Sequence, residues 1–139
     1  MSLEETVRYY YVDRYYNCCE AIIHGANEYY GLNVTEEDMK MFGGFGGGMY
    51  TGIVCGTLVA CVAVLSKMVV KESARKEGKA VRPIISDLVK SFRNELDGIS
   101  CAELKPKYYT PEDSCLKTVL LATKVLERCV DKLNEGSVV

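Results

Sequence analysis

The sequence has no tryptophan, a single histidine (His24) and only three prolines among its 139 residues. With one histidine and no G-x-S-x-G segment, it lacks the pairing of base and nucleophile on which conventional hydrolases depend. It also lacks a Gly-Lys-Ser/Thr sequence, which argues against a Walker-type nucleotide site. The net charge is −2, and basic residues are not interleaved with aromatic ones, so we expect no binding to nucleic acid.

Long apolar runs are missing as well. The most apolar stretch, residues 53–65, is interrupted only by Gly56 and Thr57, and a run of roughly 10–14 residues is too short to span a bilayer. We interpret it as a buried core helix that is apolar on every face and surrounded by other helices. The opening residues, MSLEETVRYY, are acidic where a signal peptide has a basic region. We therefore expect a cytoplasmic protein that is not bound to a membrane.

No stretch shows the period-two alternation of a β-strand, and the sequence therefore predicts an all-α fold. The length fits a single domain, residues 1–139, folded as a bundle of about five to six helices around the apolar one. Asn17 and Glu20 form a capping-box pattern at the start of the second helix, and Gly31 is its expected C-cap. The helices are expected at residues 3–16, 18–30, 35–38, 53–65, 83–97 and 111–134.

Cysteine is the residue type that carries the functional argument. Separated cysteines in a reducing compartment point to metal binding or redox chemistry, the alternative being that they are small buried hydrophobic residues. Cys18, Cys55 and Cys115 are expected at helix starts, where thiolates are favoured, and Cys101 in the connector before the last helix. The seven cysteines are Cys18, Cys19, Cys55, Cys61, Cys101, Cys115 and Cys129.

We expect the sulfur atoms of the first-turn and connector cysteines to meet at one end of the bundle. Four sulfurs are the donor set of a tetrahedral zinc site or an iron–sulfur cluster. The spacing alone does not establish such a site, because the sequence contains no C-x-x-C pair.

A glycine-dense loop precedes the apolar helix. It contains Gly46, Gly47 and Gly48, and Gly56 follows Cys55 at the start of the helix. A dinucleotide site would need a preceding strand and a βαβ unit, which the sequence does not predict. We expect these glycines to let the main chain pass close to Cys55 or to a bound cofactor, the alternative being a tight turn.

The arrangement of these cysteines and glycines resembles the family of redox-active proteins known by the signature C_GCAxxG_C_C. Residues 17–22 (NCCEAI) are similar to the family's N-C-x-Q-A-V, and residues 45–49 (FGGGM) precede Cys55-Gly56. Thr57 and Ala60 stand where the family has alanine and glycine. The family's four signature cysteines fall on Cys18, Cys55, Cys101 and Cys115, whereas Cys19, Cys61 and Cys129 lie outside the signature.

The resemblance implies a redox-active cysteine centre that can carry a cluster. The first interpretation is a small redox protein whose four signature cysteines bind a metal, preferably iron–sulfur, or cycle between thiol and disulfide with Cys55 as the attacking thiol. Its partner would be a redox protein or a small-molecule electron donor or acceptor. The second interpretation is a structural or interaction protein with a zinc site or merely buried cysteines. Catalytic activity and homo-oligomer formation are left open.

Overall fold

A computed structural model describes residues 1–136 of the chain. Within these residues it contains seven α-helices and no β-strand, so the all-α prediction is confirmed with slightly more helices than expected. No helix in this part of the chain is both long and apolar enough to cross a membrane. The helices are α1 (Leu3–Arg8), α2 (Cys18–Tyr30), α3 (Glu36–Met39), α4 (Gly56–Val69), α5 (Gly78–Leu96), α6 (Cys101–Tyr108) and α7 (Leu116–Asn134).

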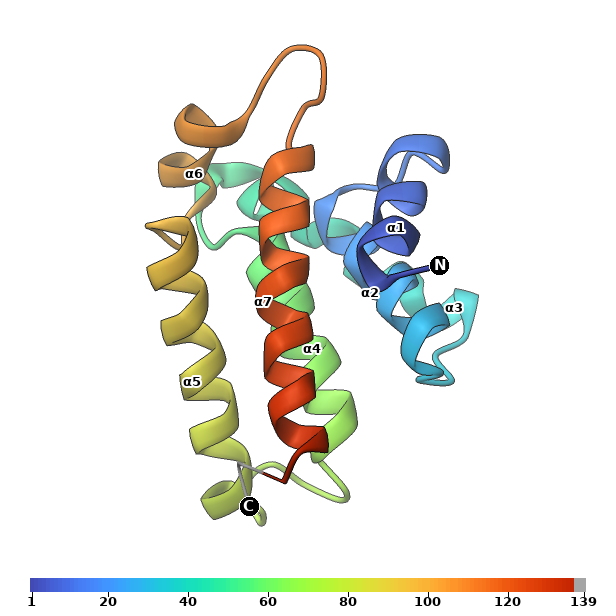
Figure 1. Cartoon of the computed structure of the whole chain (residues 1–139), viewed down its shortest axis with the longest axis vertical. Coiled ribbons are helices and arrows are strands. Elements are labelled where there is room, and N and C mark those ends of the chain that lie inside the picture. The colour runs from blue at the N-terminus through green and yellow to red at the C-terminus, as the bar shows by residue number, and fades with distance from the viewer. Residues whose placement is uncertain (137–139) are drawn as a thin grey trace.

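The three longest helices, α4, α5 and α7, form the body of the molecule. Helices α4, α5 and α7 pack against one another along the long axis, and α6 lies at the end where α7 begins (Figure 1). Helix α2 packs against α4, and α1 packs against both α2 and α7. The first turns of α2, α4, α6 and α7 are thereby gathered at one end of the bundle (Figure 1).

The core lies between these helices. The predicted apolar stripe of α5 is buried at Leu88, Phe92 and Leu96, each of which is fully shielded from solvent. Burial of such a side chain stabilises the fold by about 1.5–3 kcal/mol. Helix α4 has Leu65 in the same core, but Val59 on another face is only partly buried. The expectation that α4 is covered on every face is therefore not confirmed.

The predicted start and end of α2 are confirmed in detail. Asn17 Oδ1 accepts a hydrogen bond from the Glu20 N–H at 2.9 Å, and a Glu20 carboxylate oxygen accepts one from the Asn17 N–H at 3.0 Å. Gly31 ends the helix in the left-handed conformation, with φ +67°. Because this capping box satisfies the N–H groups of the N-cap residue and of the third helical residue, it fixes Cys18 as the first residue of α2.

The prediction was wrong at the two helix starts near the later cysteines. Residues 101–108 form α6 instead of a connector, because Ser100 and Glu103 make a second reciprocal capping box. Helix α7 begins at Leu116 and not at residue 111. Thr110 and Ser114 exchange backbone hydrogen bonds of 3.1 and 2.7 Å, which close a tight turn before the helix.

Other boundaries also differ from the prediction, and the apolar helix expected at residues 53–65 is α4, Gly56–Val69. The first helix continues from α1 as a π-helical turn, Tyr9–Asp13, and ends before Tyr15, which has a φ of +63°. Helix α5 begins at Gly78, so Pro83 lies inside it and not in its first turn. The Glu77 carboxylate accepts hydrogen bonds from three backbone N–H groups of the preceding turn. These bonds fix the start of α5 at Gly78.

Candidate cysteine centre

Four cysteines lie around one cavity where the starts of four helices converge. Cys18 is the first residue of α2 and Cys101 the first of α6, while Cys55 and Cys115 are the residues that precede α4 and α7. All four line one small cavity of about 30 Å³. The cavity is thus bordered by four helix N-termini, each of which presents the positive end of a helix dipole.

The glycine at the start of α4 permits the close approach of α2. A Cβ atom on Gly56 would lie 2.5 Å from the Phe45 carbonyl oxygen and 2.9 Å from Cys18 Sγ. Both distances are shorter than any stable contact, so a side chain at this position would displace the loop or the cysteine.

The loop glycines do not all have the same role. Gly48 has a φ of +63°, and a Cβ atom there would lie 2.8 Å from Cys101 Cβ. Gly47, with a φ of +59°, also lines the cavity. Gly46 does not, since it packs against the Asn17 side chain instead. Of the four glycines expected at the centre, Gly47, Gly48 and Gly56 are therefore placed there.

Backbone hydrogen bonds hold the cysteines in place. The Cys55 N–H donates to the Ile99 carbonyl at 2.8 Å, and the Cys101 N–H donates to the Ile53 carbonyl at 2.7 Å. These two bonds join the segments that lead into α4 and α6. The Cys115 N–H donates to the hydroxyl oxygen of Tyr11 at 2.9 Å, so that the start of α7 is fixed by a residue from the other end of the sequence.

Burial dominates the electrostatics of three of these thiols. It raises the pKa of Cys18 to about 12, with a further contribution from the nearby Cys55 and Cys115, while a hydrogen bond from the Gly47 backbone opposes the shift. Burial also raises the pKa of Cys101 and of Cys115, again helped by neighbouring cysteines and opposed by Lys105. For Cys18 and Cys115, which were expected as thiolates at helix starts, desolvation therefore outweighs the effect of the helix terminus, and the pKa is raised instead.

Cys55 is the most enclosed of the four and has a polar neighbour. Its side chain is buried, and its sulfur lies 3.0 Å from the hydroxyl oxygen of Thr57, which is itself fully buried. Thr57 is the residue that replaces the alanine of the family signature. The departure thus places a hydroxyl group against the sulfur, a contact that alanine could not make.

The remaining cysteines lie outside the cavity. Cys19 and Cys61 are fully buried in the core, and the Cys61 thiol donates to the Ala122 carbonyl at 3.6 Å. Cys129 is partly buried on α7. His24, which the sequence did not assign to the site, is buried beneath the Tyr16 ring at a centroid distance of 4.1 Å.

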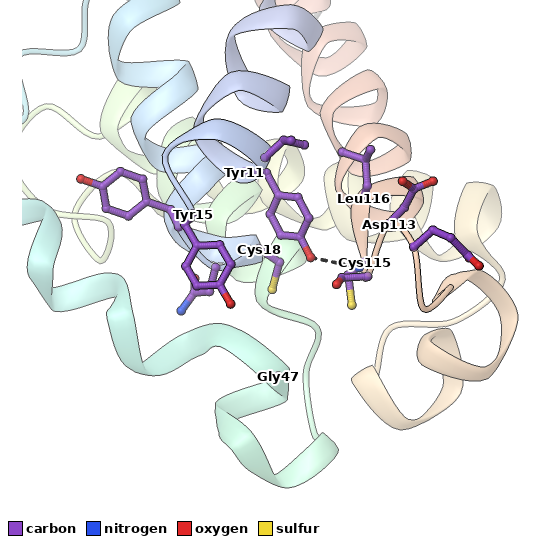
Figure 2. A pocket seen from close by; sticks show the side chains of 12 residues that line it. Tyr11, Tyr15, Cys18, Gly47, Asp113, Cys115 and Leu116 are labelled. Carbon is purple, nitrogen blue, oxygen red and sulfur yellow. Dashed lines mark hydrogen bonds between the residues drawn. The ribbon is translucent and has the colours of Figure 1, made fainter.

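A larger, open pocket adjoins the centre and was not predicted. It has a volume of about 460 Å³, and both Cys18 and Cys115 line it. Tyr11 lies between these two cysteines, with its hydroxyl group directed at Cys115 (Figure 2). The sequence gives no signal for this role of Tyr11. Its partner Cys115 is distant in the chain, and nothing in the sequence pattern distinguishes Tyr11 from the neighbouring tyrosines.

The four cavity cysteines are of a chemical type that binds metals. Four cysteine sulfurs are the ligands of tetrahedral zinc and of iron–sulfur clusters, and the bordering helix N-termini favour a negatively charged thiolate site. Within residues 1–136, however, no three His, Cys, Asp or Glu side chains are grouped so that they could hold a metal ion, and all seven cysteines are free thiols. A site at these sulfurs would therefore require the cysteine side chains to draw closer together.

Comparison with known proteins gives one match. The model of a family described as "Putative redox-active protein (C_GCAxxG_C_C)" matches residues 16–129, which is most of the chain and includes all four cavity cysteines. No curated protein and no solved structure matches the chain. The match confirms the resemblance that the cysteine and glycine pattern predicted. The chain belongs to the C_GCAxxG_C_C family.

Proposed function

We propose that this protein is a redox protein and that Cys18, Cys55, Cys101 and Cys115 act together as its redox centre. The observation that carries the proposal is the position of all four around one cavity, each at the N-terminus of a different helix. A core that needed only small apolar residues would have no reason to collect thiols at four helix starts. Cys19 and Cys61, which lie inside helices and in the core, illustrate that ordinary packing role.

The preferred form of this centre is a metal or iron–sulfur site held by the four cysteines. Such a group, when bound, would supply one-electron transfer at a potential tuned by burial and hydrogen bonds. Gly47, Gly48 and Gly56 keep the main chain close to the sulfurs. A bound cation would offset the raised pKa values of Cys18, Cys101 and Cys115, because positive charge stabilises neighbouring thiolates.

A thiol/disulfide couple is the second candidate, and the open pocket favours it. Cys18 and Cys115 both line that pocket, so a small oxidant can reach two thiols of the same centre. In this form the two thiols lose two electrons and two protons and a sulfur–sulfur bond joins them, while the oxidant gains the two electrons. Attack by Cys55 remains a prediction, although its sulfur is more enclosed than those of Cys18 and Cys115.

The electron partner follows from either form. A metal site would exchange electrons with a redox protein, and a dithiol would exchange them with a small-molecule donor or acceptor as well. We expect a reducing, cytoplasmic location, in which well-separated cysteines remain thiols.

Anaerobic purification followed by visible absorbance and by iron and zinc analysis tests the proposal. We expect iron and a visible chromophore in the natural protein and in a Cys129→Ser control, and loss of both in single Cys→Ser variants of the four cavity cysteines. A metal-free protein that forms a reversible Cys18–Cys115 disulfide would support the second candidate. Zinc without any redox couple would indicate a structural or interaction protein, and the absence of metal and couple together would reject the redox function.

A further inference from the structure

The open pocket beside the cysteine centre has a distinct chemical character. Its wall contains the aromatic side chains of Tyr11, Tyr15 and Tyr16. The only charged residues among those that line it are Glu112 and Asp113. Figure 2 shows Tyr15 on the side of Cys18 and Asp113 on the side of Cys115, with Tyr11 between the two cysteines.

We propose that this pocket admits small, positively charged thiols or disulfides, such as those that carry an amine, to Cys18 and Cys115. The inference rests on the proposed redox function and adds the class of its small-molecule substrate. Aromatic faces attract cations, and so do carboxylates, so both kinds of wall favour the same sign of charge. A volume of about 460 Å³ lies within the range of small-molecule sites.

The two carboxylates at the pocket are exposed at the surface. In residues 1–136, the side chains of Glu112 and Asp113 have no hydrogen bond or ion pair. Two cations lie near the pocket without pairing with them: the Arg14 guanidinium lies over the Tyr10 and Tyr16 rings, and Lys105 lines the adjacent buried cavity. A ligand that enters the pocket therefore meets two carboxylates that have no ion-pair partner.

The backbone fixes the aromatic wall. The Tyr11 hydroxyl oxygen accepts the Cys115 N–H at 2.9 Å, which ties the wall to the start of α7. Tyr15 adopts a φ of +63°, a conformation that residues other than glycine rarely adopt, and the residue is 92% exposed at the rim. The Tyr16 N–H donates to the Tyr10 carbonyl at 3.1 Å and closes this turn. The wall is thus built by the fold and does not depend on a ligand.

The exchange reaction at this site balances with a disulfide R–S–S–R as the oxidant. One of the two cysteines, as a thiolate, attacks a sulfur of the ligand, forming a protein–S–S–R bond and releasing R–S⁻, which takes up a proton. The thiolate of the other cysteine then attacks the protein sulfur of that mixed disulfide. The second R–S⁻ leaves and is protonated, so that two electrons have passed from the protein to the ligand.

Thiosulfonate reagents of different charge test the pocket on the full-length protein. The protein is first reduced with a phosphine and desalted, and it is then kept with a chelator so that metal does not protect the thiols. Each reagent transfers its R–S group to a cysteine and releases methanesulfinate. Rates at every cysteine are measured by mass spectrometry with a trimethylammonium, a neutral methyl and an anionic sulfonate reagent. The pKa of a given thiol cancels from the ratio of two such rates.

At low salt we expect the cationic-to-anionic rate ratio at Cys18 and Cys115, divided by the same ratio for a small free thiol, to be about ten, the effect of two carboxylates at a separation of roughly 7 Å with partial screening. This normalised ratio should fall close to one in the Glu112→Gln, Asp113→Asn double variant. Cys129 is the internal control, since the charged residues that shift its pKa are Lys132, Arg128 and Asp87 and not these two carboxylates. Its ratio should be the same in both proteins.

Three results would overturn the proposal: a normalised ratio close to one at low salt, a normalised ratio that the double variant leaves unchanged, or failure of every reagent to reach Cys18 and Cys115. None of these results depends on whether the protein carries a metal or a disulfide couple. The proposed redox function and the proposed substrate class can therefore fail separately.

Discussion

The glycine at the start of α4 gives the sharpest test of how the centre is assembled. In a Gly56→Ala variant the new Cβ atom would lie 2.5 Å from the Phe45 carbonyl oxygen and 2.9 Å from Cys18 Sγ. The carbonyl belongs to the main chain and cannot turn aside as the end of a flexible side chain can. The variant must therefore move the glycine loop, α2 or α4, and each of these carries part of the cysteine centre.

Two opposing effects set the size of the change in stability. Overpacking of a buried site costs typically about 1–3 kcal/mol, whereas replacement of glycine by alanine in a helix gains at most about 1 kcal/mol. We expect the free energy of unfolding to fall by about 1–2 kcal/mol. Chemical denaturation measures this loss as a lower midpoint at an unchanged m-value.

Gly78 provides a matched control, because it too is the first residue of a helix. A Cβ atom on Gly78 would meet only the Arg82 side chain, at 3.2 Å, and that side chain is long and exposed. The Gly78→Ala variant should be as stable as the natural protein or more stable by up to about 1 kcal/mol. If Gly56→Ala proves as stable as Gly78→Ala, the close contact between α4 and Cys18 does not exist in solution, and the proposed centre loses its support.

Three further predictions concern the core, the single histidine and the pocket wall. Leu65→Ala should lower the free energy of unfolding by about 2–4 kcal/mol and Val62→Ala by less, because Leu65 is fully buried and Val62 only partly; equal denaturation midpoints would contradict this packing. Burial lowers the pKa of His24 despite the opposing charges of nearby carboxylates, so the unfolded chain binds the proton more readily. Stability should therefore fall as the pH drops below the unfolded value of about 6.5, and a His24→Gln variant should show a flatter decline between pH 7 and 5. Tyr11→Phe removes the acceptor of the Cys115 N–H, which should cost about 1 kcal/mol and speed alkylation of Cys115 relative to Cys129; unchanged rates would show that the bond does not hold this residue.

Local sequence signals were sufficient where neighbouring residues decide the structure. Asn17 and Glu20 lie one helical turn apart, so their capping box is set by a few residues and predicts the start of α2 correctly. Ser100 and Glu103 have the same spacing. The signal for α6 was therefore present in the sequence, and the prediction of a connector there overlooked it. The order of cysteines and glycines, likewise a property of the sequence alone, indicated the family that the comparison confirmed.

The start of α7 shows where local signals fail. Thr110, Pro111 and the acidic residues after them are typical of a helix start, yet the helix begins at Leu116. Residues 110–114 close a turn instead, and the Cys115 N–H has its partner in Tyr11, 104 residues away in the chain. A hydrogen bond between such distant residues depends on how α1 packs against α7, and no local pattern encodes it.

The pKa values of the thiols also depend on the tertiary structure. From the sequence alone, a helix start favours the thiolate, which is a local effect of unpaired N–H groups. In the fold, Cys18, Cys101 and Cys115 are removed from water and placed near one another, and both changes raise their pKa. The sequence by itself determined which cysteines stand at or near helix starts and in what order. Only the tertiary structure brought them around one cavity beside a tyrosine-walled pocket, because desolvation and the proximity of distant segments arise when the helices pack.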